Sequence, residues 1–133
     1  MTVTIRPTSE WRLRARLQRA AVAAGTLSSD DAYALQLWPD DFTAEVDSAL
    51  DAYEVSVRAL AAPSDDDIFA AIERVVRDLN DIDAKHGNIE TGEREELCEY
   101  IDSVLVAAGI DPEALAARRG IDRAELTDFW RDW

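Results

Sequence analysis

The sequence predicts an all-α protein, a compact bundle of about six helices in a single domain. Three observations support this fold class. Apolar residues recur at three- and four-residue steps along most of the chain, which is the spacing of one helix face. The 133 residues, 47% of them hydrophobic, are enough to bury a core without disulfides. Five glycines and four prolines are too few for extended disorder, and most stand at expected helix ends.

The first 27 residues are expected to form a basic N-terminal arm and helix. Residues 1–7 alternate weakly between polar and apolar and end at Pro7, which predicts a short edge strand or a frayed arm. Ser9 is a suitable N-cap for a helix that runs to about Ala24, and Gly25 closes it. One face of this helix is basic and carries Arg12, Arg16 and Arg19.

Two helices are predicted between residues 28 and 62. Ser28 or Ser29 begins a short helix that Pro39 ends, although alternation with a period of two leaves a strand open there. A longer helix is expected from about Asp40 to Ala62. Its apolar stripe consists of Phe42, Val46, Ala49, Leu50, Tyr53, Val57 and Leu60. Its other face includes the acidic residues Asp40, Asp41, Glu45, Asp47 and Asp51.

Residues 64–109 are predicted to be a central helical hairpin. Ser64 caps the first helix and Gly87 ends it, while Thr91 caps the second and Gly109 ends that one. The apolar faces are Ile68, Ile72, Val75, Val76, Leu79 and Ile82 on the first helix, and Leu97, Tyr100, Ile101, Val104, Leu105 and Ala108 on the second. We expect these two faces to close on each other. The polar side of the second helix carries Glu95, Glu96, Glu99 and Asp102.

Residues 110–133 are predicted to form a corner of two short helices, over 111–119 and 122 to about 133. Asp111 and Asp122 each follow a Gly-Ile pair and are expected N-caps. The corner is similar to the helix-turn-helix of DNA-binding proteins, with Gly120 at the turn. The second helix would carry three acids, Asp122, Glu125 and Asp128. Because such a helix repels phosphate, a regulatory or DNA-associated module is only an alternative reading.

The charge of the chain is strongly negative and unevenly distributed. The formal net charge is −14, and residues 1–27 contribute +4 while residues 28–133 contribute −18. A body of this charge repels nucleic acid and anionic membranes and attracts basic partners, unless the charge serves solubility alone. The face of Arg12, Arg16 and Arg19 is expected to dock on this acidic body, and an external anionic ligand is the alternative.

Paired acids suggest an enzymatic alternative. Asp78-x-x-Asp81 and Glu96-x-x-Glu99 resemble the metal-binding pairs of all-helical nucleoside triphosphate pyrophosphatases, which implies a metal-dependent phosphohydrolase. The apolar stripes, however, direct these acids away from the bundle interior, where such a site would need them. His86 and Cys98 are the only histidine and cysteine, and we expect a cap and a half-buried apolar residue. We therefore predict no catalytic residue, metal or cofactor.

The segment Ile89–Cys98 and the closing Trp130-Arg131-Asp132-Trp133 resemble a group of small acidic bacterial proteins for which no activity is established. In size and charge the chain also resembles immunity proteins and antitoxins, which neutralise toxins. That resemblance implies a non-enzymatic protein that occludes a basic partner such as a nuclease. The single cysteine favours a reducing cytoplasm, and no apolar run is long enough to span a membrane.

The expected partner surface combines acidic rows with aromatic anchors. The predicted contacts are Asp40, Asp41, Glu45, Asp47, Asp51, Glu95, Glu96, Glu99, Asp102, Trp130 and Trp133. The two tryptophans have a second reading, in which the C-terminal end folds back and packs its rings on the bundle. The carboxylates are expected to spread over the outer surface instead of converging on a pocket.

Overall fold

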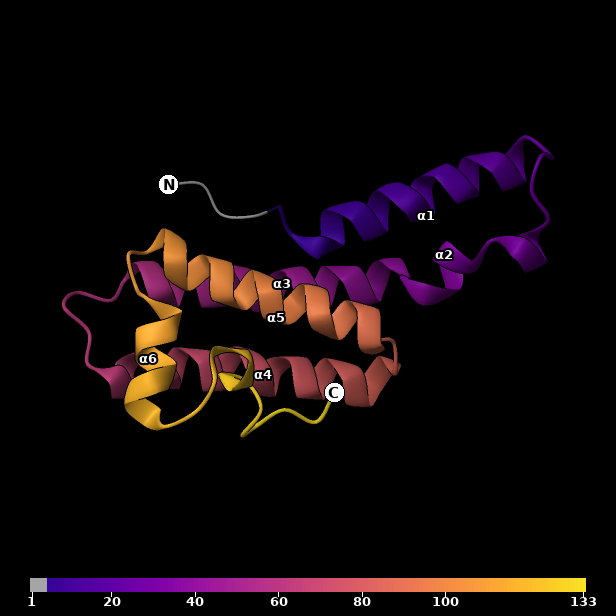
Figure 1. Cartoon of the computed structure of the whole chain (residues 1–133). Helices are drawn as coiled ribbons and strands as arrows, with labels where there is room; N and C mark the ends of the chain where they lie inside the picture. The colour runs from indigo at the N-terminus through magenta and orange to yellow at the C-terminus, as the bar shows by residue number, and fades with distance from the viewer. Residues whose placement is uncertain (1–4) are drawn as a thin grey trace.

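The computed structural model describes residues 5–133. Within them the chain forms six α-helices and two 3₁₀ turns with no strand, so the all-α prediction is confirmed (Figure 1). The helices are α1 (Pro7–Ala23), α2 (Tyr33–Leu37), α3 (Asp40–Arg58), α4 (Asp65–His86), α5 (Thr91–Ala107) and α6 (Pro112–Arg119), and the 3₁₀ turns are Ser29–Asp31 and Arg123–Glu125. Residues 1–4 of the expected N-terminal strand or arm lie outside the described residues. None of the described helices combines the length and the apolar character that crossing a membrane requires.

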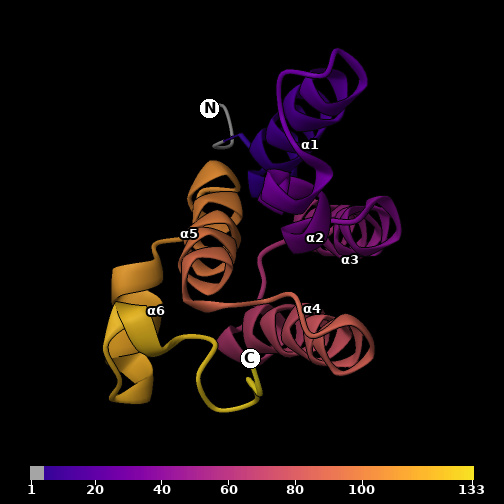
Figure 2. The same cartoon turned by 90° about the vertical axis from the view of Figure 1, so that its right-hand side faces the viewer.

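The antiparallel pair of α3 and α4 forms the centre of the bundle (Figures 1 and 2). The apolar faces of α4 and α5 belong to one core as expected, but α4 packs most closely against α3. Small residues such as Ala49 let the two backbones approach, and Ala49 lies beside Ile82 in the seam between them. The Tyr53 hydroxyl ties α5 to α3 by donating to the Ile101 carbonyl at 2.8 Å.

The N-terminal helix belongs to the core. It begins at Pro7, two residues before the predicted Ser9 cap, because proline is favoured at the first helical position. Trp11 is 1% exposed, and its ring stacks on Trp38 and Phe42 with centroids 6.0 and 5.9 Å away. This aromatic stack joins α1 to α2 and α3.

Helix α3 ends at Arg58, four residues before the predicted end. The residue that precedes Pro63 is Ala62, which adopts a positive φ of 47°. A residue before proline is disfavoured in the right-handed helical conformation, which excludes Ala62 itself from the helix. The next helix is capped as expected, with Ser64 and Asp67 forming a reciprocal capping box.

The predicted helix over residues 122–133 does not form. Asp122 and Glu125 make the expected cap, but only one 3₁₀ turn follows, and residues 126–130 continue as turns without a helix. The cause is the side chain of Asn80, whose Nδ2 donates to the Trp130 carbonyl at 2.8 Å and whose Oδ1 accepts from the Asp132 amide at 2.9 Å. These bonds hold the last residues against α4, and the Asp132 amide is one that a helix would direct to the Asp128 carbonyl. The helix-turn-helix alternative therefore lacks its recognition helix.

Candidate functional site

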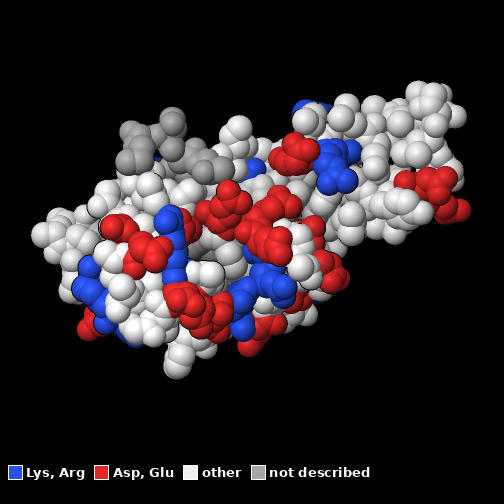
Figure 3. All heavy atoms as spheres, in the orientation of Figure 1, with Lys and Arg blue, Asp and Glu red and all other residues white. Residues whose placement is uncertain are grey.

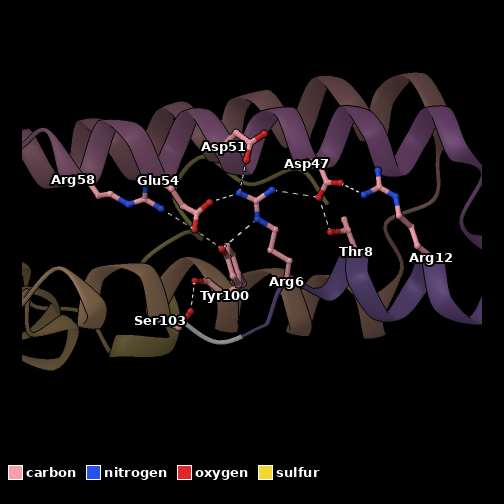
Figure 4. Close-up of polar contacts among 9 residues, drawn as sticks. All are labelled: Arg6, Thr8, Arg12, Asp47, Asp51, Glu54, Arg58, Tyr100 and Ser103. Atoms are coloured by element: carbon pink, nitrogen blue, oxygen red, sulfur yellow. Dashed lines mark hydrogen bonds and ion pairs between the residues drawn. The ribbon is translucent and has the colours of Figure 1, made fainter. Parts of the chain in front are cut away.

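Most of the predicted acidic row on α3 is paired with cations of the chain itself (Figure 4). Arg6 forms ion pairs with Asp47, Asp51 and the buried Glu54. Asp47 also pairs with Arg12 and accepts a hydrogen bond from the Thr8 hydroxyl at 2.6 Å. Two of the predicted partner contacts, Asp47 and Asp51, are thus already paired within the chain.

The buried Glu54 connects this network to α5. Its Oε1 accepts a hydrogen bond from the Tyr100 hydroxyl at 2.6 Å, and Arg58 lies 3.7 Å from the same oxygen. Burial and the Glu54 carboxylate raise the pKa of Tyr100. Burial disfavours the charge on Arg6, but hydrogen bonds to Tyr100, Asp51 and Glu54 outweigh it and raise the guanidinium pKa. The network therefore stays charged on Arg6 and neutral on Tyr100.

The other end of the α3 row is partly paired as well. Glu45 contacts His86 and accepts from Lys85 at 2.9 Å, and these hydrogen bonds lower the pKa of Glu45. Asp40 lies 3.7 Å from Arg19. Asp41 is exposed and accepts only from the backbone of the next residue, at 2.9 Å. Little of this row is left for an external cation.

The three arginines of the predicted basic face of α1 differ in whether they form ion pairs. Arg12 and Arg19 dock on Asp47 and Asp40 as the internal reading expects. Arg16 is exposed and forms no ion pair within residues 5–133. The docking prediction thus describes two of these three arginines.

The acidic row on α5 differs, because two of its members are free. Glu96 accepts from the Trp11 indole nitrogen at 3.3 Å, and burial raises its pKa. Asp102 holds Arg123 through two bonds of 2.6 and 2.7 Å. Glu95 and Glu99 are exposed and form no ion pair in the described part of the chain. They lie four residues apart, so they share one side of the helix.

These two glutamates line a groove with a volume of about 550 Å³. The groove runs between α5 and the C-terminal segment, and Figure 3 shows acidic and basic side chains alternating over this face. Its apolar lining includes Cys98, Ile101 and Leu126. Its charged lining consists of Arg94, Glu95, Glu99, Asp102, Arg123 and Arg131. The volume falls within the range of ligand pockets.

Two of the arginines in the groove are already engaged. Arg123 is held by Asp102, and Arg131 pairs with Asp128 at 2.7 Å. Arg131 also reaches Cys98, with Nη1 3.8 Å from Sγ. Arg94 forms no ion pair among the described residues, so the unpaired charges of the lining are those of Glu95, Glu99 and Arg94. Sequence reasoning missed the groove, because its second wall exists only when residues 122–133 leave the helical path.

The aromatic C-terminus mostly folds back on the bundle. Trp133 is 8% exposed and its indole nitrogen donates to the Val76 carbonyl at 3.4 Å, which does not fit its predicted role as a partner contact. Trp130 is half-buried against Phe69, with ring centroids 6.5 Å apart. The exposed ring is Phe129, at 89%. A continuous helix would have turned Phe129 toward the bundle, so no sequence pattern predicted that its ring would be exposed.

The acid pairs of the enzymatic alternative do not meet. Asp78 and Asp81 line a shallow hollow between α3 and α4. Glu96 and Glu99 line another hollow beside Pro7 and Tyr100. Over residues 5–133, no three histidine, cysteine or acidic side chains gather in a way that could hold a metal ion.

Comparison with models of protein families finds no match, and neither characterised proteins nor solved structures show significant similarity to the chain.

Proposed function

We propose that this protein is a non-enzymatic acidic binding protein that occludes a basic protein partner, in the manner of an immunity protein or antitoxin. The observation that carries the proposal is the pair of free carboxylates, Glu95 and Glu99, at the rim of a groove with an apolar floor. The acidic residues of the α3 row, by contrast, mostly form ion pairs with cations of the same chain. We propose the cytoplasm as its compartment, because the chain carries one cysteine and needs no disulfide.

The groove suits a lysine or arginine side chain of the partner. The aliphatic stem would lie on Ile101 and Leu126, while the charged end meets Glu95 and Glu99. The net charge of −14 would steer a cationic partner toward the protein before contact. Exposed Phe129, on the segment that forms the second wall, could add apolar contact area.

The test uses a deca-arginine peptide as the basic probe, with deca-glutamine as the neutral control peptide. We expect saturable binding that weakens steeply with salt, and about a tenfold weaker Kd for the Glu95→Gln/Glu99→Gln variant, measured by calorimetry. The matched control is Asp30→Asn/Asp31→Asn, which removes the same charge from an exposed remote turn. Equal weakening in both variants would mean that only net charge matters and that the groove is not the site.

A further inference from the structure

Helix α1 has a second apolar face, opposite the one it buries. The buried side includes Trp11 and Ala15, and Val22 is half-buried. The outer face is formed by Leu13, Leu17, Ala20 and Ala24. Their spacing of four, three and four residues places them on one line along the helix, and the rotation of about 100° per residue puts that line opposite Trp11 and Ala15.

This outer face is open to solvent. Leu13 is 39% exposed and Leu17 is 60% exposed, and both alanines are exposed. Figures 1 and 2 show α1 at the edge of the molecule, with its C-terminal half projecting beyond the bundle. No element within residues 5–133 covers the leucines. Two exposed leucines one turn apart on a helix edge are typical of a helix-docking surface.

The charges beside this face indicate what it binds. Arg16 lies on one side of the leucine line and Arg14 on the other, and neither forms an ion pair with a carboxylate among the described residues. Arg14 instead stacks on the Trp38 ring, 4.6 Å from its centroid. Arg74 and Arg94 also form no ion pair among the described residues, but of these four arginines only Arg14 and Arg16 border the exposed apolar line of α1. An acidic partner would supply carboxylates to Arg14 and Arg16.

We propose that the outer face of α1 docks an amphipathic helix of an acidic partner protein, whose apolar stripe is bordered by aspartate or glutamate. Leu13 and Leu17 would pack into that stripe, and the small Ala20 and Ala24 would let the two backbones approach closely. Arg14 and Arg16 would pair with the bordering carboxylates. This surface is separate from the α5 groove and binds the opposite kind of charge.

Two other occupants fit the observations less well. The α1 of a second copy would bring the same arginines and only Glu10 as an acid, so the charges would not complement each other. An anionic membrane would be repelled by the acidic body, whose residues 28–133 carry −18. The outer face also lacks the aromatic residues that anchor interfacial helices.

The experiment titrates ¹⁵N-labelled protein with two synthetic 18-residue helical peptides. Both peptides carry the same leucine-alanine stripe, bordered by glutamate in one and by lysine in the other. We expect the glutamate peptide to bind saturably and to shift the amide signals of residues 13–24. Leu17→Gln should weaken binding about tenfold, and Arg16→Gln about threefold with a smaller salt dependence. The control Val55→Gln, at a 64% exposed apolar position on α3, should leave the affinity unchanged.

Each contrary outcome has a distinct meaning. No shift of the α1 signals at about 1 mM glutamate peptide overturns the proposal, as does equal or tighter binding of the lysine peptide. Self-association that Leu17→Gln abolishes, measured by sedimentation, would make a second copy the occupant. Leu17-dependent binding to phosphatidylserine vesicles would make a membrane the occupant. Because the deca-arginine test of the groove uses other residues and the opposite charge, either proposal can fail alone.

Discussion

At the scale of single residues, the Glu54 carboxylate shows how the chain manages a buried acid. The residue is 7% exposed and sits between Arg6 from the N-terminal arm and Tyr100 from α5. A buried carboxylate without such partners would cost several kcal/mol. The three groups stabilise one another from three separate elements, so the network fixes how α1, α3 and α5 meet.

Replacing Tyr100 by phenylalanine tests this network. The change removes the hydroxyl that donates to Glu54 and leaves the ring in place, so we expect a loss of about 1–2 kcal/mol in the free energy of unfolding, measured with urea. The folded-state pKa of Tyr100 is raised, so the hydroxyl contributes fully below pH 10 and its contribution is lost as pH rises through the raised pKa. The difference between wild type and variant should therefore shrink at high pH.

Tyr33 provides the comparison, because it is 60% exposed. Tyr33→Phe should change the free energy of unfolding by less than about 0.5 kcal/mol. A Tyr100→Phe variant as stable as Tyr33→Phe at neutral pH would contradict the role assigned to the network.

At the scale of elements, sequence patterns predicted what depends on neighbours in the chain. Helical spacing, the Ser64 cap and the stop at Gly87 depend on residues a few positions apart, and all are present. Contacts between distant segments were not predictable in the same way. Asn80 redirects residues 130–132 from a position fifty residues earlier, and no local pattern signals that role.

The candidate site illustrates the same limit. Glu95 and Glu99 were predicted as contacts from their helical spacing and charge, and they are exposed. Asp47 and Asp51 on α3 were predicted on equal grounds but pair with Arg6, whose position depends on how the N-terminal arm folds. Free and internally paired acids look alike in a sequence, because pairing is decided by tertiary packing.

Replacing Asn80 by alanine should release the C-terminal segment. The variant loses two hydrogen bonds to the backbone of Trp130 and Asp132, so we expect a destabilisation of about 1–2 kcal/mol. Tryptophan fluorescence should shift to longer wavelength as Trp130 and Trp133 gain solvent. The control is Asp81→Ala, an exposed neighbour on α4 with no side-chain partner in the described residues. Unchanged fluorescence in Asn80→Ala would show that other contacts hold the segment.

At the scale of the whole molecule, a basic helix and an acidic body are joined by an apolar core. Residues 1–27 carry +4 and the remaining residues carry −18, so attraction between them favours the folded state. The ion pairs themselves are largely exposed, as with Arg12 at 47% and Arg19 at 56%, and such pairs contribute little individually. The fully buried Trp11 contributes more, because its ring stacks between α2 and α3.

The contrast between exposed ion pairs and the buried Trp11 predicts that apolar packing, and not charge, attaches the N-terminal helix to the rest of the bundle. Trp11→Ala should cost about 3–5 kcal/mol, a large share of the about 5–15 kcal/mol that stabilises a typical domain. Deleting residues 1–27 should therefore abolish cooperative unfolding, followed by circular dichroism. The Arg12→Gln/Arg16→Gln/Arg19→Gln variant should stay folded and lose no more than about 2 kcal/mol, since only Arg12 and Arg19 have acidic partners. If the triple variant unfolded while Trp11→Ala remained stable, the ion pairs with the acidic row of α3 would be the dominant attachment of the N-terminal helix.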